Sequence, residues 1–234
     1  MQTYLFSSKG PRITNQDAAS LTYVSGGVLL CVADGVGGNN GGEVASKLAI
    51  EVFLREVISS KSSFSFSKAM EVAHNEIKER ASEDAELSGM ATTFTAVFVT
   101  SERVIGIHCG DSRAYILRDN GIKQLSEDHS EVAKLIRSGK LTKEAAVDYP
   151  RKNVIYSALG SHKELVVDEF EFELVSQDRI VLVTDGVHGV VSKKTFRDTS
   201  LNSSSLKEWC DTIVTILEGL GPEDNFTIAS VELD

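Results

Sequence analysis

Two runs of mostly apolar, β-branched residues in this chain each lead directly into an Asp-Gly pair. Residues 28–33 (VLLCVA) precede Asp34, and residues 180–184 (IVLVT) precede Asp185. Runs of this length and composition predict buried strands, which place both carboxylates at the rim of the core. An uncompensated buried charge is costly. A fold that collects several such aspartates must therefore pair them with cations, hydrogen-bond them or bind metal.

Two further aspartates stand where expected strands give way to turns. Asp111 lies between two such strands, and Asp224 comes just before the last one. Strand ends at one edge of stacked sheets can bring all four carboxylates together. Without Cys or His at ligand spacing, they favour Mg²⁺ or Mn²⁺ over Zn²⁺. Gly35, having no side chain, lets its backbone carbonyl approach the same ion as Asp34. For any single Asp-Gly pair a tight turn remains the alternative, and the set of four favours metal.

The order of the expected elements indicates the fold class. Strands are expected at residues 4–7, 28–33, 93–100, 104–108, 113–117, 166–172, 179–184 and 226–233. Helices are expected at 42–57, around 70–81 and around 206–217, with a serine-rich loop at 59–67. Two helices in succession precede three closely spaced strands. This order favours antiparallel meanders over strict strand-helix alternation, and thus an α+β protein with helices packed over antiparallel sheets.

Bulk properties exclude several classes of protein. The 234 residues, 41% of them hydrophobic, suit one sizeable domain or two small ones, and we expect one. A net charge of −10 argues against broad binding to nucleic acid or anionic membranes. No charged leader and no apolar stretch of about 18 residues is found, so we expect a cytoplasmic protein. The three cysteines lack paired spacing and are expected to be buried thiols rather than a disulfide or a zinc site.

The spacing of residues excludes several other functional motifs. The glycine-rich stretch at 35–42 is not followed by Gly-Lys-Ser/Thr and breaks the dinucleotide pattern, so a nucleotide site is not expected there. No twelve-residue loop has the alternating acidic residues of an EF-hand, and no serine occupies a Gly-x-Ser-x-Gly turn.

A set of short motifs runs through nearly the whole chain. They are RITNQD at 12–17, ADGVGG at 33–38, ATT at 91–93, GDSRAY at 110–115, SEDHS at 126–130, PRKNV at 150–154, ALG at 158–160, TDG at 184–186 and EDNFT at 223–227. In this order they resemble the metal-dependent protein phosphatases of the protein phosphatase 2C type, especially the compact bacterial members. The resemblance implies a four-layer α-β-β-α sandwich with two antiparallel sheets. It also implies a single catalytic domain over 1–234, with a flap-like segment at about 129–153.

The resemblance further implies a set of metal ligands. Asp34 would bridge two ions, with the Gly35 carbonyl on one of them and Asp185 and Asp224 on the other. Asp111 would help to hold a third, weaker ion. Two divalent ions acidify a water molecule between them and neutralise phosphoryl charge during in-line displacement, so no covalent phosphoenzyme is needed.

Supporting roles follow from the same resemblance. Asp17 would hold a metal-bound water, and Asn225 would support that shell. Arg12 would clamp the phosphate, because a guanidinium meets phosphate oxygens as a planar fork. Arg113, which follows Asp111 on an expected strand, is interpreted as a structural ion-pair partner.

Three positions depart from the family pattern, and His188 is a candidate substitute for the acid that one of them removes. Gln16 stands where many members have glutamate, and Val36 replaces the histidine that animal members use as a general acid, so the identity of the acid is open. His188 is expected to be an exposed turn residue. Gly189 stands where the family usually has an aspartate that helps to bind the third ion, which predicts a weaker third site.

The flap-like segment is basic in an otherwise acidic chain. Its cations are Lys134, Arg137, Lys140, Lys143, Arg151 and Lys152. They are candidates for guiding phosphorylated substrates, above all the last two, with a solvated helix face as the alternative for the others.

The resemblance implies a serine/threonine protein phosphatase that hydrolyses phosphoserine and phosphothreonine. Its partners would be phosphorylated proteins, among them a serine/threonine kinase and its targets, and it would act as a monomer. The alternative is a catalytically weak phosphoprotein-binding module of the same fold, which the departures at Val36 and Gly189 favour.

Overall fold

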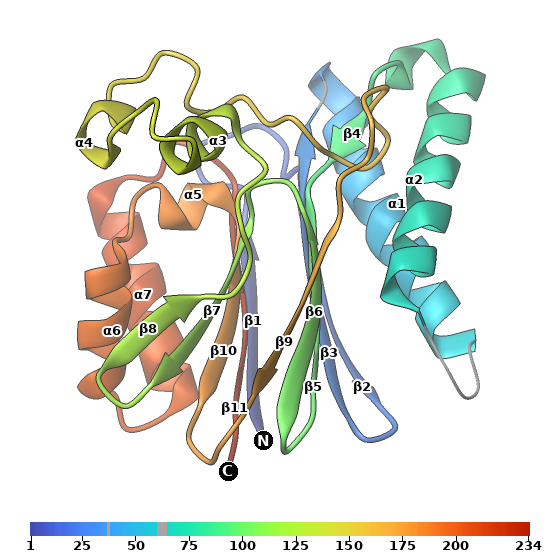
Figure 1. Ribbon diagram of the computed structural model, residues 1–234. Coiled ribbons are helices and arrows are strands. Elements are labelled where there is room, and N and C mark those ends of the chain that lie inside the picture. Colours follow the sequence, from blue (N-terminus) through green and yellow to red (C-terminus); the bar gives the residue numbers. More distant parts are fainter. Residues whose placement is uncertain (37, 60–64) are drawn as a thin grey trace.

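A computed structural model describes residues 1–36, 38–59 and 65–234, apart from the side chains of residues 38–40. Two antiparallel sheets pack face to face, and helices cover both outer faces (Figure 1). The expected α+β class and four-layer sandwich are confirmed.

The first sheet joins strands from both ends of the chain. Its strands, in spatial order, are β1 (Gln2–Ser8), β11 (Phe226–Glu232), β10 (Arg179–Val183), β7 (Arg113–Arg118) and β8 (Gly121–Gln124). The second sheet runs β2 (Asp17–Val24), β3 (Gly27–Val36), β5 (Phe94–Val99), β6 (Arg103–Cys109) and β9 (Asp168–Glu173), and the short β4 (Ala91–Thr92) pairs with β3.

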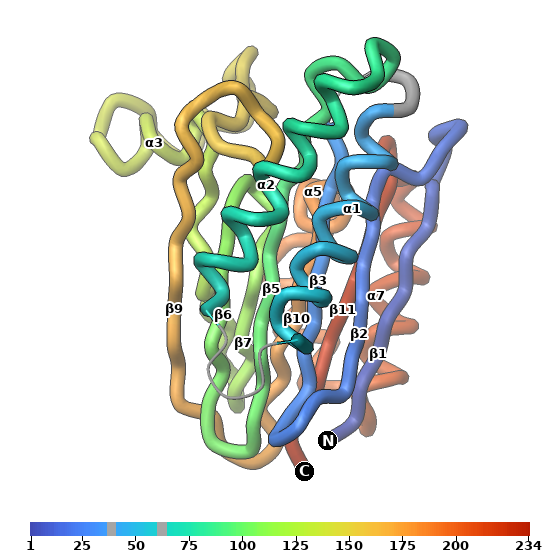
Figure 2. The backbone as a smooth tube through the Cα atoms, turned by 90° about the vertical axis from the view of Figure 1, so that its right-hand side faces the viewer, coloured from blue at the N-terminus to red at the C-terminus, as the bar shows by residue number. Residues whose placement is uncertain are grey.

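Each sheet has its own helical layer. Helices α1 (Gly38–Ser59) and α2 (Phe66–Glu83) cover the second sheet, as Figure 2 shows from that side. Helices α6 (Lys193–Leu201) and α7 (Leu206–Leu220) cover the first. Three short helices lie at the end of the sandwich opposite the termini: α3 (Glu131–Arg137), α4 (Lys143–Ala146) and α5 (Asp185–His188) (Figure 1). A 3₁₀ turn, η1 (Ala85–Leu87), follows α2.

The unbroken apolar runs are explained by burial on both faces of each sheet. Along β3, Leu29 and Cys31 pack toward α1 and α2, whereas Val28 and Leu30 pack into the layer between the sheets. The residues of β10 alternate in the same way between the face covered by α7 and the layer between the two sheets. Strands covered on both sides lose the polar alternation of a half-solvated sheet.

Several boundaries differ from the sequence-based expectation. The strand expected at 28–33 continues through Asp34 to Val36, because β4 pairs Gly35 with Thr92 and Val36 with Ala91. Asp34 therefore lies inside a strand rather than beyond its end. Strands β2, β4 and β8 and helices α3 to α6 were not predicted, because they are short or lack a strong apolar period. Of the loop expected at 59–67, residues 60–64 lie outside the described residues.

Two other expectations concern chemistry and membrane insertion. All three cysteines are buried free thiols, which confirms their interpretation. No helix in the described part of the chain is long and apolar enough to cross a bilayer.

Candidate metal centre and active site

The buried carboxylate of Asp17 has one satisfied oxygen and one unsatisfied oxygen. The hydroxyls of Thr184 and Thr227 donate to Oδ2 at 2.8 and 2.7 Å. Oδ1 has no hydrogen-bond partner among the described residues, although the side chain is only 4% exposed. Burial raises the pKa of Asp17 to about 7, against the lowering effect of the two hydroxyls and with a further increase from Asp185 and Asp224. A ligand bound at this site would supply the partner that this buried acceptor lacks.

Asp34 is held rigidly at the upper end of β3. Its backbone N–H donates to Oγ1 of Thr93 at 2.9 Å, and its carbonyl accepts from the Thr92 hydroxyl and the Thr93 N–H, both at 2.9 Å. Burial raises the pKa of Asp34 well above its ordinary value, and the charges of Asp17, Asp185 and Asp111 raise it further. In this environment the Asp34 carboxyl group either keeps its proton or binds a cation.

Gly35 is required by close packing against the start of α1. A Cβ at this position would lie 2.0 Å from the backbone oxygen of Gly42. Any side chain would force the strand and the helix apart, so glycine keeps the Asp34 carboxylate next to the helix.

Asp185 enters the site from the other sheet as the first residue of α5. A hydrogen bond links its carboxyl group to that of Asp34. Burial raises the pKa of Asp185, and the negative charge of Asp224 adds to this shift. Two carboxyl groups in hydrogen-bond contact share a proton in the absence of a cation.

Arg12 and Asp224 form an ion pair at the rim. Nη2 of Arg12 donates to Oδ2 of Asp224 at 2.8 Å, and both side chains are about half exposed. Asn225 orders the loop that carries Arg12, because its Nδ2 donates to the carbonyls of Lys9 and Thr14 and its Oδ1 accepts from the Gln16 N–H. The resemblance implies that Asn225 supports the metal shell, and in the structure this residue both orders the loop and lines the carboxylate cavity.

Asp111 follows Gly110, whose φ of +108° suits glycine, in the turn between β6 and β7. Burial raises the pKa of Asp111 to about 7, with Asp185 and Asp128 adding to the shift. His188 was expected to be an exposed turn residue, and this was wrong. Its ring is partly buried, and Nε2 donates to the Asp111 carbonyl at 2.9 Å, which joins α5 to this turn. Burial lowers the pKa of His188 to about 4, so the ring is neutral.

The carboxylates converge on one cavity of about 880 Å³. Its lining residues are Pro11, Arg12, Ile13, Thr14, Gln16, Asp34, Gly35, Val36, Thr93, Asp111, Asn153, Ile155, Asp185, Asp224 and Asn225. All four aspartates expected at one sheet edge are brought together here. The sequence analysis did not identify the threonines that orient Asp17 and Asp34. The only indication of these threonines in the sequence was their position within the ATT, TDG and EDNFT motifs.

The donor set fits hard divalent cations. Among the described residues, no three His, Cys, Asp or Glu side chains already stand in a ready coordination geometry. The cluster is instead compensated by the Arg12–Asp224 ion pair and by the Asp34–Asp185 hydrogen bond. Oxygen-only donors with raised pKa values, together with the unsatisfied Asp17 Oδ1, suit Mg²⁺ or Mn²⁺.

The basic residues of the flap are engaged elsewhere or lie outside the cavity. Arg151 donates to Oε2 of Glu131 through Nε and Nη2 at 3.0 and 2.7 Å, and Glu131 also accepts from the Tyr149 hydroxyl at 2.6 Å. None of the six candidate cations is among the cavity-lining residues, whereas Asn153 and Ile155 are. Arg113 is a structural partner as interpreted: it forks onto Asp128 at 2.6–3.1 Å.

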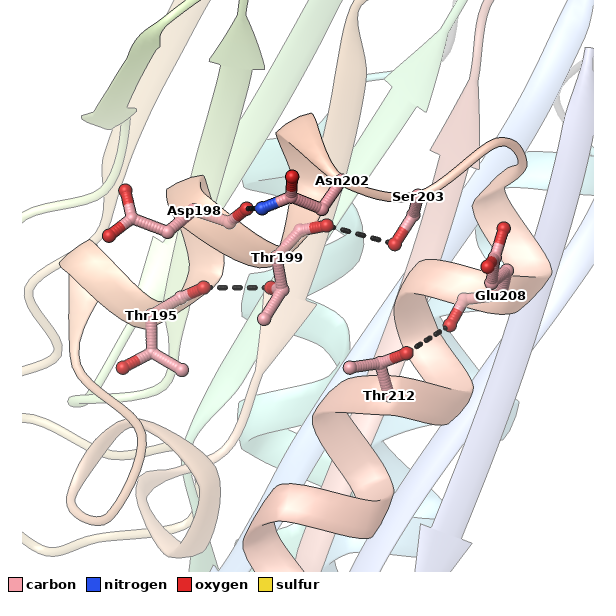
Figure 3. A pocket seen from close by; sticks show the side chains of 7 residues that line it. All are labelled: Thr195, Asp198, Thr199, Asn202, Ser203, Glu208 and Thr212. Carbon is pink, nitrogen blue, oxygen red and sulfur yellow. Dashed lines mark hydrogen bonds between the residues drawn. The ribbon is translucent and has the colours of Figure 1, made fainter.

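A second pocket, between α6 and α7, does not offer comparable chemistry (Figure 3). The hydroxyls of Thr199, Ser203 and Thr212 each donate to a carbonyl one turn earlier on the chain. The polar groups that line this pocket thus stabilise their own helices.

Comparisons with known proteins point to one family. A family model described as protein phosphatase 2C matches residues 10–224. The serine/threonine phosphatase stp of Listeria welshimeri is 34% identical over 212 residues, covering 87% of this chain and 84% of that protein. Protein phosphatase PhpP of Streptococcus pneumoniae is 29% identical over 242 residues, covering 100% and 98%.

Solved structures give the same result. The serine/threonine phosphatase Stp1 of Staphylococcus aureus superimposes with a TM-score of 0.92 at 26% identity, over 100% of this chain and 95% of that one. The catalytic domain of the serine/threonine phosphatase PstP, in complex with two manganese ions, gives 0.85 at 28% identity, over 100% and 98%.

Proposed function

This chain belongs to the protein phosphatase 2C family and is a metal-dependent serine/threonine protein phosphatase, and we propose that it hydrolyses phosphoserine and phosphothreonine at the Asp34 carboxylate cluster. The observation that carries the proposal is the convergence of four aspartates from both sheets on one open cavity, with a guanidinium at its rim. Phosphorylated proteins are its substrates.

The residues present fit a dinuclear centre. Asp34 would be a ligand shared by both ions, the Gly35 carbonyl would be a ligand on one of them, and Asp185 and Asp224 would be ligands on the other. Asp111 is the proposed ligand of a weaker third ion, for which Gly189 supplies no carboxylate. Bound there, divalent ions would acidify a water molecule and neutralise phosphoryl charge.

The side chains of this protein supply orientation and charge. Asp17 can accept a hydrogen bond through its unsatisfied Oδ1 from a water molecule in the cavity. Arg12, freed from Asp224, can fork onto two phosphoryl oxygens. Asn225 holds the loop from which Arg12 reaches the site. No histidine is among the described residues that line the cavity, so solvent is the proposed source of the proton for the leaving oxygen.

Hydrolysis of para-nitrophenyl phosphate tests the proposal. We expect turnover with Mn²⁺ or Mg²⁺, none with EDTA, and loss with Asp34→Asn. A flat response in all three would instead support the alternative, a catalytically weak phosphoprotein-binding module, which Val36 and Gly189 favour.

We also propose the cellular setting. Three free thiols suit a reducing compartment, which supports a cytoplasmic protein that opposes a serine/threonine kinase and shares its targets. A single domain over 1–234 with a flap at about 129–153, acting as a monomer, is consistent with the two paired sheets and with the scattered exposed apolar residues.

A further inference from the structure

Apolar side chains from three separate segments line the catalytic cavity. Ile13 comes from the loop before β2, Val36 ends β3, and Ile155 follows the flap. Ile13 is 95% exposed and Val36 is 45% exposed. A single exposed apolar residue is ordinary on a protein surface, but three line this one cavity with the carboxylates, and we call these three residues the collar.

The backbone beneath each collar residue is ordered. The loop of Ile13 is tied down by the Asn225 side chain, which donates to carbonyls on either side of it. Val36 is paired with Ala91 in β4, and Ile155 forms an antiparallel bridge with Ser130. Side chains on such fixed backbone offer a preformed surface, which lowers the entropic cost of binding.

Because most charges around the cavity are negative, we expect the residues of a substrate next to its phosphorylated side chain to be recognised mainly through apolar contacts. Arg12 is the one cationic side chain among the described residues that line it, and four aspartates face it. The chain as a whole carries a net charge of −10. Acidic residues beside the phosphorylated side chain would therefore find no partner here, whereas an apolar residue would cover Ile13 and Val36.

Strand geometry sets the position of that apolar residue. In an extended peptide, side chains alternate between faces, so those two residues apart point to the same side. When a phosphorylated side chain enters the cavity, its immediate neighbours point away and the residues at −2 and +2 face the collar.

We propose that this enzyme prefers phosphorylated segments that carry a large apolar residue two positions from the phosphoserine or phosphothreonine, seated on Ile13 and Val36. The proposal rests on the proposed phosphatase activity and adds the class of substrate.

The test compares phosphothreonine peptides of one sequence with leucine at +2 or −2, with leucine at +1 or −1, or with serine throughout. For wild type, kcat/KM is expected to be about tenfold higher for a ±2 peptide than for the serine peptide, mainly through KM, as for one filled apolar contact. The ±1 peptides are expected to match the serine peptide. In Ile13→Ser the ±2 preference is expected to fall below about twofold. The matched control is Ile58→Ser, which alters an equally apolar and 58% exposed residue near the far end of α1 and should keep the preference.

A binding measurement tests this proposal independently of the phosphatase assignment. Anisotropy with labelled phosphonate analogues of the same peptides, in Mn²⁺ buffer, reports the preference without turnover. A ±2 preference in binding that Ile13→Ser removes supports the collar even if no peptide is hydrolysed, and that lack of hydrolysis would count against the activity alone. Equal binding of all peptides, a preference for the ±1 peptides, or a ±2 preference that survives Ile13→Ser would overturn the proposal.

Discussion

Asp17 on β2 and Asp34 on β3 are direct register partners in the antiparallel ladder. The ladder thus brings two acidic residues to the same level of one sheet, and the charge of Asp17 raises the pKa of Asp34. Like charges directly opposite each other destabilise a sheet. The fold therefore bears an electrostatic cost at this point, which protons or divalent cations relieve.

Removal of the ionisable group of Asp34 should stabilise the metal-free protein. In EDTA, Asp34→Asn is expected to unfold at a higher temperature than wild type, because folding no longer has to protonate this buried carboxyl or to hold it ionised near Asp17, Asp185 and Asp111. The increase in melting temperature on adding Mn²⁺ should largely disappear, since ligand-linked stabilisation requires binding to the native state. Asp119→Asn, in an exposed turn with positive φ that asparagine also adopts, is the control. An equal Mn²⁺ shift in both variants would contradict the assignment of Asp34 as a ligand.

The metal-free protein should lose stability as pH rises from about 5 to 7. Asp17 and Asp111 have native pKa values of about 7, above the ordinary value of about 3.9, so in this range the native state binds protons that the unfolded state has released. Stability then falls by up to about 1.4 kcal/mol per pH unit for each proton. Urea unfolding in EDTA measures the slope, and Asp17→Asn should flatten it. Stability that rises over this range in EDTA would show that these carboxyls are ionised in the metal-free fold.

Arg12 should affect both substrate and metal. Arg12→Ala is expected to raise KM for a phosphopeptide about tenfold or more, with a smaller change in kcat, and Arg12→Lys should recover part of the loss because it keeps charge without the fork. Loss of the Arg12–Asp224 ion pair should also lower the Mn²⁺ concentration needed for half-saturation, measured by calorimetry without substrate. Arg55→Ala, which removes an exposed ion pair with Glu76 on the helical layer, serves as the control. Unchanged KM in Arg12→Ala would exclude a phosphate-binding role.

Gly189→Asp should strengthen the third ion site. Gly189 is exposed and has a right-handed helical conformation, with φ −71°. An added Cβ would lie 2.9 Å from the backbone oxygen of Asp185, so the turn must shift in any variant at this position, and Gly189→Asn controls for that shift. An additional carboxylate raises affinity for hard cations, so half-maximal activation by Mn²⁺ should occur at a concentration several-fold lower. Gly189→Asn provides the same shape without charge and should not change it. No gain in affinity or activity in the aspartate variant would count against a third site here.

The Arg113–Asp128 ion pair should contribute to stability rather than to chemistry. Burial opposes the ionisation of Asp128, and the hydrogen bonds and charge of Arg113 nevertheless lower its pKa below the ordinary value. Arg113→Met is expected to cost about 2–4 kcal/mol of unfolding free energy, because it leaves a largely buried carboxylate. Arg103→Met, which breaks an ion pair exposed on both sides, should cost less than about 1 kcal/mol. Equal losses in urea unfolding would contradict a buried structural role.

The local pattern was sufficient to predict the long apolar strands and the four aspartates that line the cavity, whereas the four-layer arrangement and the role of Arg12 came from the family resemblance. Strands such as β3 and β10 stand out because both faces are buried and the whole run is apolar. By contrast, β2 carries Ser, Thr and Tyr among its apolar residues and faces solvent in part, so its weak pattern was missed. The prediction for His188 was wrong because the local sequence does not show that the Asp111 carbonyl, in the turn between β6 and β7, lies within hydrogen-bond distance of its ring.

The sequence by itself determined which segments must be buried and which carboxylates stand beside them, because apolar runs, strand periodicity and glycine positions are local properties of the chain. Only the tertiary structure decided that Asp17 lies opposite Asp34, that Arg12 reaches Asp224, and that Ile13 shares a cavity with Val36. These relationships join residues far apart along the chain. They depend on strand register and sheet packing, which are set by the cooperative burial of both sheets rather than by any short segment.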